Sequence, residues 1–545
     1  MNNVFHSAQK LTEYDLQLIQ KYQPQIANGE LKIRYNIQLK CLSFVKNLDI
    51  QKLTVEYCQF IEPKLKSKNI KELAINTCGL KNIGLRMKNL KVLNLQGNNI
   101  KQICLSGLMN VTELDISKNV RVDIIGLKNL RLTKLTMNHC DVDDLSVLID
   151  MDSLEELNIS GNTRVKLQLL RQMVQLKRLN ISDNNIQNLS ALESLINLEQ
   201  LNISQNVSID VSSINFFVKL SKLNAQDLEL RRIQFLLDLP NLKELDLSYN
   251  CRLDYQPLQY MVQLTILKLS FCALNNIIYL NNLVNIESLD ISNNNIINLE
   301  PINQLFKLTY LNVSKCNIKS CNFLRQLVNL EELDISYNPD INISVLNNLC
   351  KLKKLYLFSN NLKDISILTS LVNLEMLGLS GNKQVVIAPL QYLWKLTHLQ
   401  LDDCELCEIS ALAPLTNLQF LNLYKNNIIY ASPLQNMLKL SSLSLYCNKI
   451  QDLFTIMHHL NYDQYTLSNQ LQPSNDEQWL ADKMDSVHQL TSLLIKMNGK
   501  RKNNAIRVLR QNAQNVLEQL KTQDSLFVSK IVLVFNALNA RQTDQ

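Results

Sequence analysis

The chain repeats one arrangement of apolar and polar positions, LxxLxLxxN, along most of its length. The copy at 330–338 reads LEELDISYN, and the next copy, at 352–360, reads LKKLYLFSN. In the first copy Leu333 and Ile335 alternate with polar residues, and a period of two predicts a strand with one buried face. The apolar residues of 341–352 occupy a stretch too short for a long helix. We therefore expect each repeat to hold a strand followed by a 3₁₀ turn or a single helical turn.

The last position of the pattern, which we call position n, sets the length of the repeat. From Cys140 to Asn448 it recurs every 22 residues for 14 steps, and the earlier steps are 20 to 22 residues long. Apolar faces of this kind are buried only when the repeats stack, so the pattern predicts a solenoid of about 20 coils. Asparagine suits position n because its amide can both donate and accept hydrogen bonds inside the stack. Position n falls on Asn36, Cys58, Cys78, Asn98, Asn119, Cys140, Asn162, Asn184, Asn206, Leu228, Asn250, Cys272, Asn294, Cys316, Asn338, Asn360, Asn382, Cys404, Asn426 and Asn448.

This register resembles the leucine-rich repeat signature. The period is similar to the 22-residue repeats of the type-one phosphatase regulatory subunit and of bacterial internalins, and the resemblance covers about residues 30–460. It implies an α/β solenoid, a horseshoe or arc with a parallel β-sheet on the concave face and short 3₁₀ or helical segments on the convex side. It also implies protein recognition on the concave face. The partner does not follow from it, because one fold serves many functions.

The sequence departs from the regular repeat in two ways. Coils that read ISxNxxV or close to it recur mostly 44 residues apart, and the coils between them more often carry cysteine at n, which suggests that pairs of repeats duplicated together. The coil KLNAQDLELRRI places Leu228 at n and Ala225 where a larger aliphatic residue is usual. Two neighbouring departures predict a weaker joint at 222–232.

The ends of the repeat array predict helical caps, which a solenoid needs to cover its terminal coils. We expect an N-terminal helical cap in 1–29, with an amphipathic helix at 11–24. The solenoid is expected over 30–460. Helical spacing of apolar residues after Pro473 predicts a C-terminal helical cap or a separate small module in 461–545.

Composition and charge narrow the class of protein. Charged residues make up 19% of the chain, below the roughly 25% usual for globular proteins, and the net charge of +7 is modest for 545 residues. The 13 cysteines show no disulfide-framework spacing. The start lacks the apolar core of a signal peptide, and IVLVF at 531–535 is too short to span a bilayer. We expect a cytoplasmic protein, with the nucleus as the alternative.

A search for catalytic and metal-binding motifs gives no candidate enzyme site. The chain contains no GxxxxGK[ST], GxGxxG, HExxH or GxSxG sequence, so we expect no cofactor and no small-molecule substrate. Cys404 and Cys407 form a CxxC near His398, but structural zinc normally needs four ligands and no second pair follows. Carboxylates in one column belong to coils that are mostly two strands apart, about 10 Å, which is too far for an acid–base pair. They are Asp115, Asp246, Asp290 and Asp334.

Strand alternation directs the side chains at n−6, n−4 and n−2 into the concave face. Through the middle coils n−4 is nearly always asparagine or aspartate and n−2 is mostly serine, and this pattern changes at residue 354. Exposed aromatic residues grouped on one face often supply binding energy, so we predict a partner-binding surface there. The alternative is that the C-terminal helices fold back and bury these aromatic residues as core. The predicted surface consists of Lys354, Tyr356, Phe358, Met376, His398, Gln400, Asp402, Phe420, Tyr424 and Tyr446.

A basic run within 496–510 suggests a second role. It contains no acidic residue, so it could contact nucleic acid, anionic lipid or the nuclear import machinery, although a solvated loop and helix face is the commoner meaning of such a run. Our leading prediction is a non-catalytic protein–protein interaction scaffold, without nucleic-acid or membrane partners. The alternatives are a regulatory subunit of a protein phosphatase, and an adaptor tethered to nucleic acid or an anionic membrane through this run. Its main residues are Lys500, Arg501, Lys502, Arg507 and Arg510.

Overall fold

The computed structural model describes residues 13–35, 39, 42–58, 65, 67–83, 85, 87–103, 105, 107–452 and 456. The chain forms two compact units, Met1–Leu377 and Gly378–Gln545, which we describe one at a time. The predicted C-terminal cap or module at 461–545 lies outside the described residues, as does the basic run at 496–510.

The first unit contains a parallel β-sheet to which each repeat contributes one strand. From β1 to β16 every strand pairs with the next along the chain, and residues at equivalent places in successive repeats are direct partners. This arrangement confirms the predicted solenoid of stacked coils. The strands are β1 (Glu30–Arg34), β2 (Lys52–Glu56), β3 (Glu72–Asn76), β4 (Val92–Asn94), β5 (Glu113–Asp115), β6 (Lys134–Thr136), β7 (Glu156–Asn158), β8 (Arg178–Asn180), β9 (Gln200–Asn202), β10 (Lys222–Asn224), β11 (Glu244–Asp246), β12 (Ile266–Lys268), β13 (Ser288–Asp290), β14 (Tyr310–Asn312), β15 (Glu332–Asp334) and β16 (Lys354–Tyr356).

The second unit repeats the same plan. The strands β18 (His398–Gln400), β19 (Phe420–Asn422) and β20 (Ser442–Ser444) pair in parallel and in register. The strand β17 (Met376–Gly378) lies at the boundary between the units. Among the described residues, no helix has the length and apolar character that crossing a bilayer requires.

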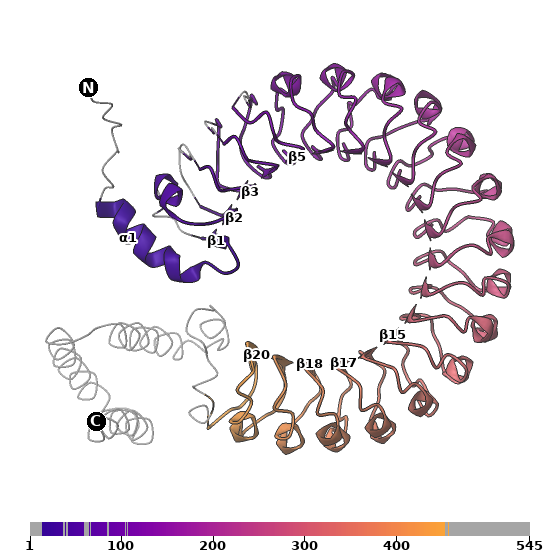
Figure 1. Ribbon diagram of the computed structural model, residues 1–545. Helices are drawn as coiled ribbons and strands as arrows, with labels where there is room; N and C mark the ends of the chain where they lie inside the picture. Colours follow the sequence, from indigo (N-terminus) through magenta and orange to yellow (C-terminus); the bar gives the residue numbers. More distant parts are fainter. Residues whose placement is uncertain are drawn as a thin grey trace, which may run out of the picture. The chain divides into compact units, whose positions relative to one another are not determined.

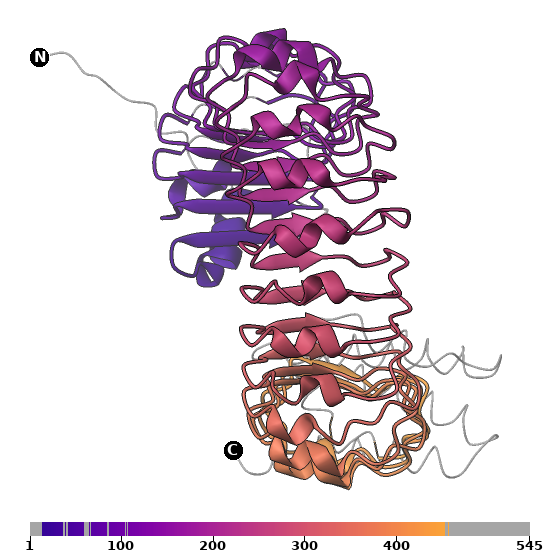
Figure 2. The ribbon, with the colours of Figure 1, turned by 90° about the vertical axis from the view of Figure 1, so that its right-hand side faces the viewer.

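The second half of most repeats forms a 3₁₀ helix, as the short apolar stretches predict. In the first unit these helices follow the outer side of the curve whose inner side the strands line (Figure 1), and they stack above one another when seen from outside (Figure 2). They are η2 (Ser43–Asn47), η3 (Ile125–Leu127), η4 (Ser146–Leu148), η5 (Leu167–Gln172), η6 (Ser190–Leu192), η7 (Ser212–Phe216), η8 (Gln234–Asp238), η9 (Gln256–Tyr260), η10 (Ile278–Leu280), η11 (Glu300–Gln304), η12 (Asn322–Leu324), η13 (Leu346–Asn348) and η14 (Ser366–Ser370), followed in the second unit by η15 (Ala388–Tyr392), η16 (Ser410–Leu412) and η17 (Ser432–Leu434). A further 3₁₀ helix, η1 (Gln23–Gln25), precedes β1.

The asparagine at position n joins each coil to the coil before it. The side-chain nitrogen of Asn338 donates to the carbonyls of Val313 and Ile335, both at 3.0 Å. Its side-chain oxygen accepts from the backbone N–H groups of Cys316 and Ile318, again at 3.0 Å. The amide thus satisfies backbone groups that would otherwise be buried without partners.

Cysteine at position n takes over only part of this role. The thiol of Cys316 donates to the carbonyl of Ile291 at 3.1 Å, the counterpart of the bond from Asn338 to Val313. A thiol is a weak donor and a weak acceptor, so it replaces the amide incompletely.

Position n−1 has a left-handed backbone in every described coil. From Tyr35 to Cys447 its φ lies between 49° and 75°. This conformation turns the chain out of the strand. Glycine occupies it in only a few coils, and lysine, aspartate, tyrosine and others occupy it elsewhere.

The 44-residue period predicted from the sequence has a backbone counterpart. In every second coil from Cys140 to Cys404, the residue at n+1 also has a positive φ. The coils between them keep n+1 out of this region. Alternate coils therefore differ in backbone as well as in sequence. The residues concerned are Asp141, Asn185, Glu229, Ala273, Asn317, Asn361 and Glu405.

A helix precedes the first coil, as the N-terminal sequence predicts. The structure places α1 at Glu13–Tyr22, inside the expected 11–24, and η1 follows it directly. Leu18 and Tyr22 are buried, and the ring of Tyr22 stacks on Phe44 of η2 with centroids 5.7 Å apart. This contact is what a cap requires, and we keep the cap at 1–29 as a proposal.

The irregular coil at 222–232 keeps its place in the stack. Ala225 and Leu228 are both buried, and the N–H of Ala225 donates to the carbonyl of Asp246 at 2.9 Å. An asparagine or cysteine at this n would donate to the carbonyl of Ile203, as Asn206 does to Ile181 at 3.0 Å. Leucine has no donor, so the departure costs one bond between coils.

Candidate partner-binding surface

The polar side chains at n−4 have a structural role in most coils. The carboxylate of Asp334 accepts the backbone N–H of Ser336 at 2.9 Å, and Asn158 accepts that of Ser160 at 3.1 Å in the same way. Such a bond satisfies the end of the strand locally. The column of aspartates found in the sequence is therefore explained by the backbone, and it supplies no acid–base pair.

The serine side chains at n−2 in the middle coils are less exposed on the strand face than strand alternation predicts. Five of the eight serines are buried: Ser182, Ser204, Ser248, Ser292 and Ser336. Two of them accept a hydrogen bond from the next coil, Ser248 from the N–H of Ser270 at 3.2 Å and Ser336 from that of Phe358 at 3.0 Å. For these serines the prediction of an exposed polar row is wrong.

The n−6 side chains pair across neighbouring strands in several places. Glu156 lies between Lys134 at 2.6 Å and Arg178 at 2.8 Å, and Lys354 meets Glu332 at 2.9 Å. Burial would raise the pKa of Glu156, but hydrogen bonds and charge from Lys134 and Arg178 outweigh burial, and the pKa is lowered.

Tyr356 interrupts the column of n−4 caps. Tyrosine cannot accept the n−2 N–H as aspartate does, and the N–H of Phe358 instead donates to the hydroxyl of Ser336 in the preceding coil at 3.0 Å. The two rings stack with centroids 5.8 Å apart, and both side chains are half-buried. Burial, with a contribution from Glu332, raises the pKa of Tyr356, so the phenol is neutral at pH 7. Met376, also half-buried, follows at the end of the first unit.

The second unit carries two further aromatic pairs on its strands. His398 stacks on Phe420 at 5.9 Å, and Tyr424 stacks on Tyr446 at 5.5 Å. Gln400 lies beside Asn422 in the strand register. None of these side chains is buried, so they line the strand face of this unit.

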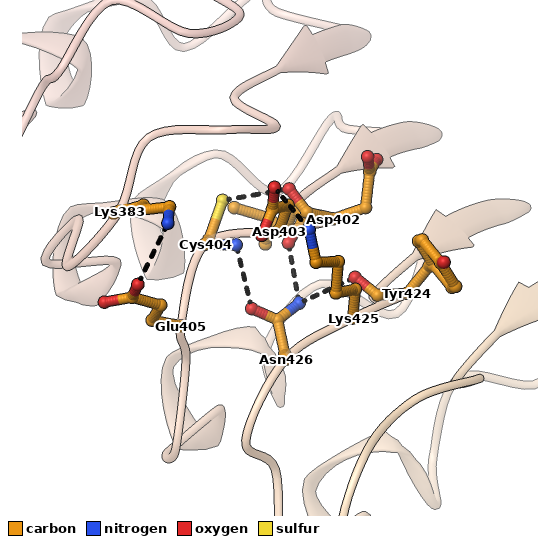
Figure 3. A network of polar contacts seen from close by, with 9 residues as sticks. Lys383, Asp402, Asp403, Cys404, Glu405, Tyr424, Lys425 and Asn426 are labelled. Atoms are coloured by element: carbon orange, nitrogen blue, oxygen red, sulfur yellow. Dashed lines mark hydrogen bonds and ion pairs between the residues drawn. The ribbon is translucent and has the colours of Figure 1, made fainter.

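Asp402 belongs to a polar network within the second unit. Its Oδ1 accepts from the Asn422 amide at 2.8 Å and from the Ser380 hydroxyl at 2.5 Å. Next to it, ion pairs join Lys425 to Asp403 at 3.1 Å and Lys383 to Glu405 at 3.4 Å around Cys404 and Asn426 (Figure 3). The charges here are paired with one another, which favours a structural role for this network.

The CxxC of the sequence is not assembled as a metal site. Cys404 is buried and its thiol donates to the carbonyl of Leu379 at 3.4 Å, while burial raises its pKa to about 12. Cys407 is exposed. Within the described part of the chain, no three histidine, cysteine, aspartate or glutamate side chains gather as metal ligands would.

The ten predicted surface residues thus divide between the units. Four lie in the first, Lys354, Tyr356, Phe358 and Met376, and six lie in the second, His398, Gln400, Asp402, Phe420, Tyr424 and Tyr446. All ten are half-buried or exposed, and Tyr424 is the most open.

The n−1 position also carries exposed aromatic side chains, which the predicted surface does not include. Tyr249, Phe271 and Tyr337 are exposed there with positive φ, a conformation that bulky residues adopt at a cost. Alternation alone could not find them, because they follow the end of the strand.

Comparison with known proteins identifies the family of the repeat. Family models described as leucine-rich repeats match residues 350–391, 89–111 and 238–255. The chain is a leucine-rich repeat protein. By sequence, no curated protein matches it.

Several solved structures share the leucine-rich repeat fold. A chain of the mouse RP105/MD-1 complex is 19% identical, with a TM-score of 0.53, over 78% of this chain and 87% of that one. A leucine-rich repeat protein of Leptospira interrogans is 22% identical, with a TM-score of 0.49, over 66% of this chain and 92% of its own. An internalin of Listeria monocytogenes is 24% identical, with a TM-score of 0.40, over 61% of this chain and 86% of its own.

Proposed function

We propose that this leucine-rich repeat protein is a non-catalytic scaffold that binds a protein partner on its strand face. The observation that carries the proposal is Tyr356, which stands where most coils place a capping asparagine or aspartate. A chain that only had to stack would be served by aspartate there, as at Asp334. The local cap is given up, and Ser336 of the neighbouring coil replaces it.

The aromatic residues have the properties of interface anchors. Tyr356 and Phe358 form a stack, so their rings are held in place before a partner arrives, and ordering them on binding costs less. Tyrosine is also among the residue types that contribute most to binding energy at protein interfaces. The ion pair of Lys354 with Glu332 fixes the neighbouring side chain.

The second unit supports the same function with its own residues. The pairs of His398 with Phe420 and Tyr424 with Tyr446 present rings on the strand face, with Gln400 and Asn422 between them as hydrogen-bonding groups. Aromatic rings beside polar side chains are the usual composition of a protein interface.

The alternatives have less support in the described residues. No observation beyond the repeat length favours regulation of a protein phosphatase. The tethered adaptor depends on Lys500, Arg501, Lys502, Arg507 and Arg510, which lie outside the described residues.

The proposal is tested by the double substitution Tyr356→Ala and Phe358→Ala in the intact chain. Partners captured from cells by wild type and by the variant are compared by quantitative mass spectrometry. We expect a specific partner to fall by about tenfold, since losing two central aromatic anchors costs at least about 1.4 kcal/mol.

The matched control removes one tyrosine and one phenylalanine from the 3₁₀ side of the same unit. Tyr260→Ala and Phe216→Ala take away exposed rings at the ends of η9 and η7. Circular dichroism should show both variants folded, and the control should keep every partner. If the strand-face variant keeps every partner as well, the proposed surface is wrong.

A further inference from the structure

A second surface lies on β11–β15, where the charged n−6 column is interrupted. Along this column the strand register places Glu244, Ile266, Ser288, Tyr310 and Glu332 side by side. Ile266 and Tyr310 are only half-buried. Three neighbouring strands therefore present uncharged side chains between two glutamates.

The sheet edge beside these strands carries exposed aromatic residues. Tyr249 and Phe271 are 44% and 40% exposed, and their rings stack with centroids 4.6 Å apart. Three coils after Phe271, Tyr337 is 47% exposed, and the ammonium of Lys315 lies 4.9 Å from its ring centroid. This edge thus already holds one cation over an aromatic ring.

The backbone conformation at these three positions does not favour aromatic side chains. Their φ angles are 63° at Tyr249, 53° at Phe271 and 57° at Tyr337, all in the left-handed region. Asparagine tolerates this region better, and Asn293 occupies it in the coil after Phe271. The aromatic side chains keep an unfavourable conformation that a small polar residue would relieve.

The charge of the surface indicates what it can bind. At n−6 and n−4 of these five strands, the acidic residues are Glu244, Asp246, Asp290, Glu332 and Asp334, and the one basic residue is Lys268, for a net charge of −4. The whole chain carries +7. In the part of the chain that the structure describes, Glu244 and Glu332 have ion-pair partners, in Lys222 and Lys354, whereas the three aspartates have none.

The pKa shifts of two side chains on these strands agree with a negative local potential. Burial raises the pKa of Asp334 against hydrogen bonds from Ser336, and Asp290 and Glu332 raise it further. Burial, followed by charge from Asp290 and Glu332, raises the pKa of Tyr310 to about 12. A cation brought to these strands would relieve the repulsion.

We propose that the β11–β15 surface binds a basic polypeptide segment of a partner, with arginine or lysine side chains set against the Tyr249–Phe271 stack and the three aspartates. Arginine combines both contacts, because its guanidinium stacks on aromatic rings and pairs with carboxylates. A phosphate backbone would be repelled by the same carboxylates, which excludes nucleic acid as the occupant. The surface adjoins the Tyr356 and Phe358 pair at β15, where Asp334 lies beside Tyr356, but Asp246, Asp290 and the Tyr249–Phe271 stack belong to other coils.

Fluorescence anisotropy on the full chain tests this with two labelled peptides, six repeats of Arg-Ala and six repeats of Glu-Ala. We expect the arginine peptide to bind at least about tenfold more tightly than the glutamate peptide, despite the positive charge of the whole chain. Higher ionic strength should weaken it, because exposed charges are screened.

Two variants that the repeat itself tolerates locate the binding. Asp246→Asn, Asp290→Asn and Asp334→Asn together remove the charge and keep the cap, since asparagine caps the same position at Asn158. Tyr249→Asn and Phe271→Asn remove the rings and suit the left-handed backbone. Each variant should weaken the arginine peptide by about fivefold or more.

Matched controls place the same changes elsewhere in the first unit. Asp115→Asn in β5 and Tyr57→Asn, an exposed n−1 aromatic residue, should leave the affinity unchanged. Tyr356→Ala with Phe358→Ala should weaken it far less than either surface variant, because only β15 of this surface lies beside that pair, and this difference distinguishes the surface from the proposed function. The proposal is overturned if the arginine peptide does not bind at concentrations up to about 1 mM. It is equally overturned if either surface variant binds like wild type.

Discussion

Position n holds asparagine in most coils and cysteine in six, and the two residues hold the stack with unequal strength. Asn338 makes hydrogen bonds to two backbone N–H groups and to carbonyls of its own and the preceding coil. Cys316 supplies a thiol donor to carbonyls and no comparable acceptor. At the scale of one residue, stability should therefore depend on which kind of coil is altered.

Replacing Asn338 with alanine should destabilise the chain by about 3 kcal/mol or more, because several buried backbone groups lose their partners at about 1–3 kcal/mol each. Cys316→Ala should cost about 1 kcal/mol, the loss of one weak bond and a small side chain. Urea unfolding of both variants compares the shifts in midpoint. Equal shifts would contradict the different roles assigned to the two residues.

Asp334 gives a prediction for pH. Its pKa is raised in the folded chain by burial, so the folded state favours the protonated form, and ionisation opposes folding at pH 7. Asp334→Asn keeps the cap without the charge and should raise the urea midpoint at pH 7. The gain should shrink as the pH falls through the folded pKa and vanish below the ordinary pKa of aspartate, about 3.9. A gain that is independent of pH would show that charge is not its cause.

The sequence indicated the role of position n because only asparagine and cysteine recur there with a fixed period. It did not indicate position n−1, which holds tyrosine, lysine, aspartate and glycine at the same backbone angle. The turn is imposed by hydrogen bonds between coils, so it leaves no residue type as its signal. The aromatic residues Tyr249 and Phe271 therefore carry no sign in the sequence of the left-handed backbone that they adopt.

At the scale of single elements, the period predicted strands and 3₁₀ turns because each needs one apolar face toward the neighbouring coils. The n−4 caps and the n−6 ion pairs could not be read in the same way. The caps are bonds from the n−4 side chain to the backbone of its own coil, whereas the ion pairs depend on which strand lies beside which, as when Glu156 contacts β6 and β8 at once. The n−6 ion pairs contribute little to stability, since exposed ion pairs are worth about 0–1 kcal/mol.

The irregular coil around β10 should open more readily than its neighbours. The side chain of Leu228 is packed but gives no hydrogen bond to the preceding coil, and Ala225 fills less of the core than the leucines and isoleucines in equivalent coils. Amide hydrogen exchange at 222–232 is expected to be faster than in the coils of Asn184 and Asn294. Exchange as slow as in those coils would show that the strand pairing alone sustains the joint.

At the scale of the whole molecule, the repeat predicted the solenoid because no coil can bury its own apolar face. The candidate surface was predicted less completely. The sequence selected the residues that depart from the repeat, but it could not show that Asp402 is held by Asn422 and Ser380 or that the candidates fall in two units.

Deleting 496–510 separates a scaffold from a tethered adaptor. If the strand face binds the partner, the deletion should leave capture unchanged, because the aromatic residues of the repeats remain. Capture and cell fractionation of the deleted chain are compared with those of the full chain. A changed location together with loss of the partner would favour the adaptor.

The alternation of backbone turns at n+1 limits how such a protein can change in length. Excising one 22-residue repeat brings two coils of the same kind into contact, so the regular alternation of the two kinds of backbone turn is broken at the junction. Excising 44 residues, for example 316–359, restores the original order at the new junction. Growth or shortening of the array by even numbers of repeats is thus the less disruptive course, both for duplication in nature and for shortened versions made in the laboratory.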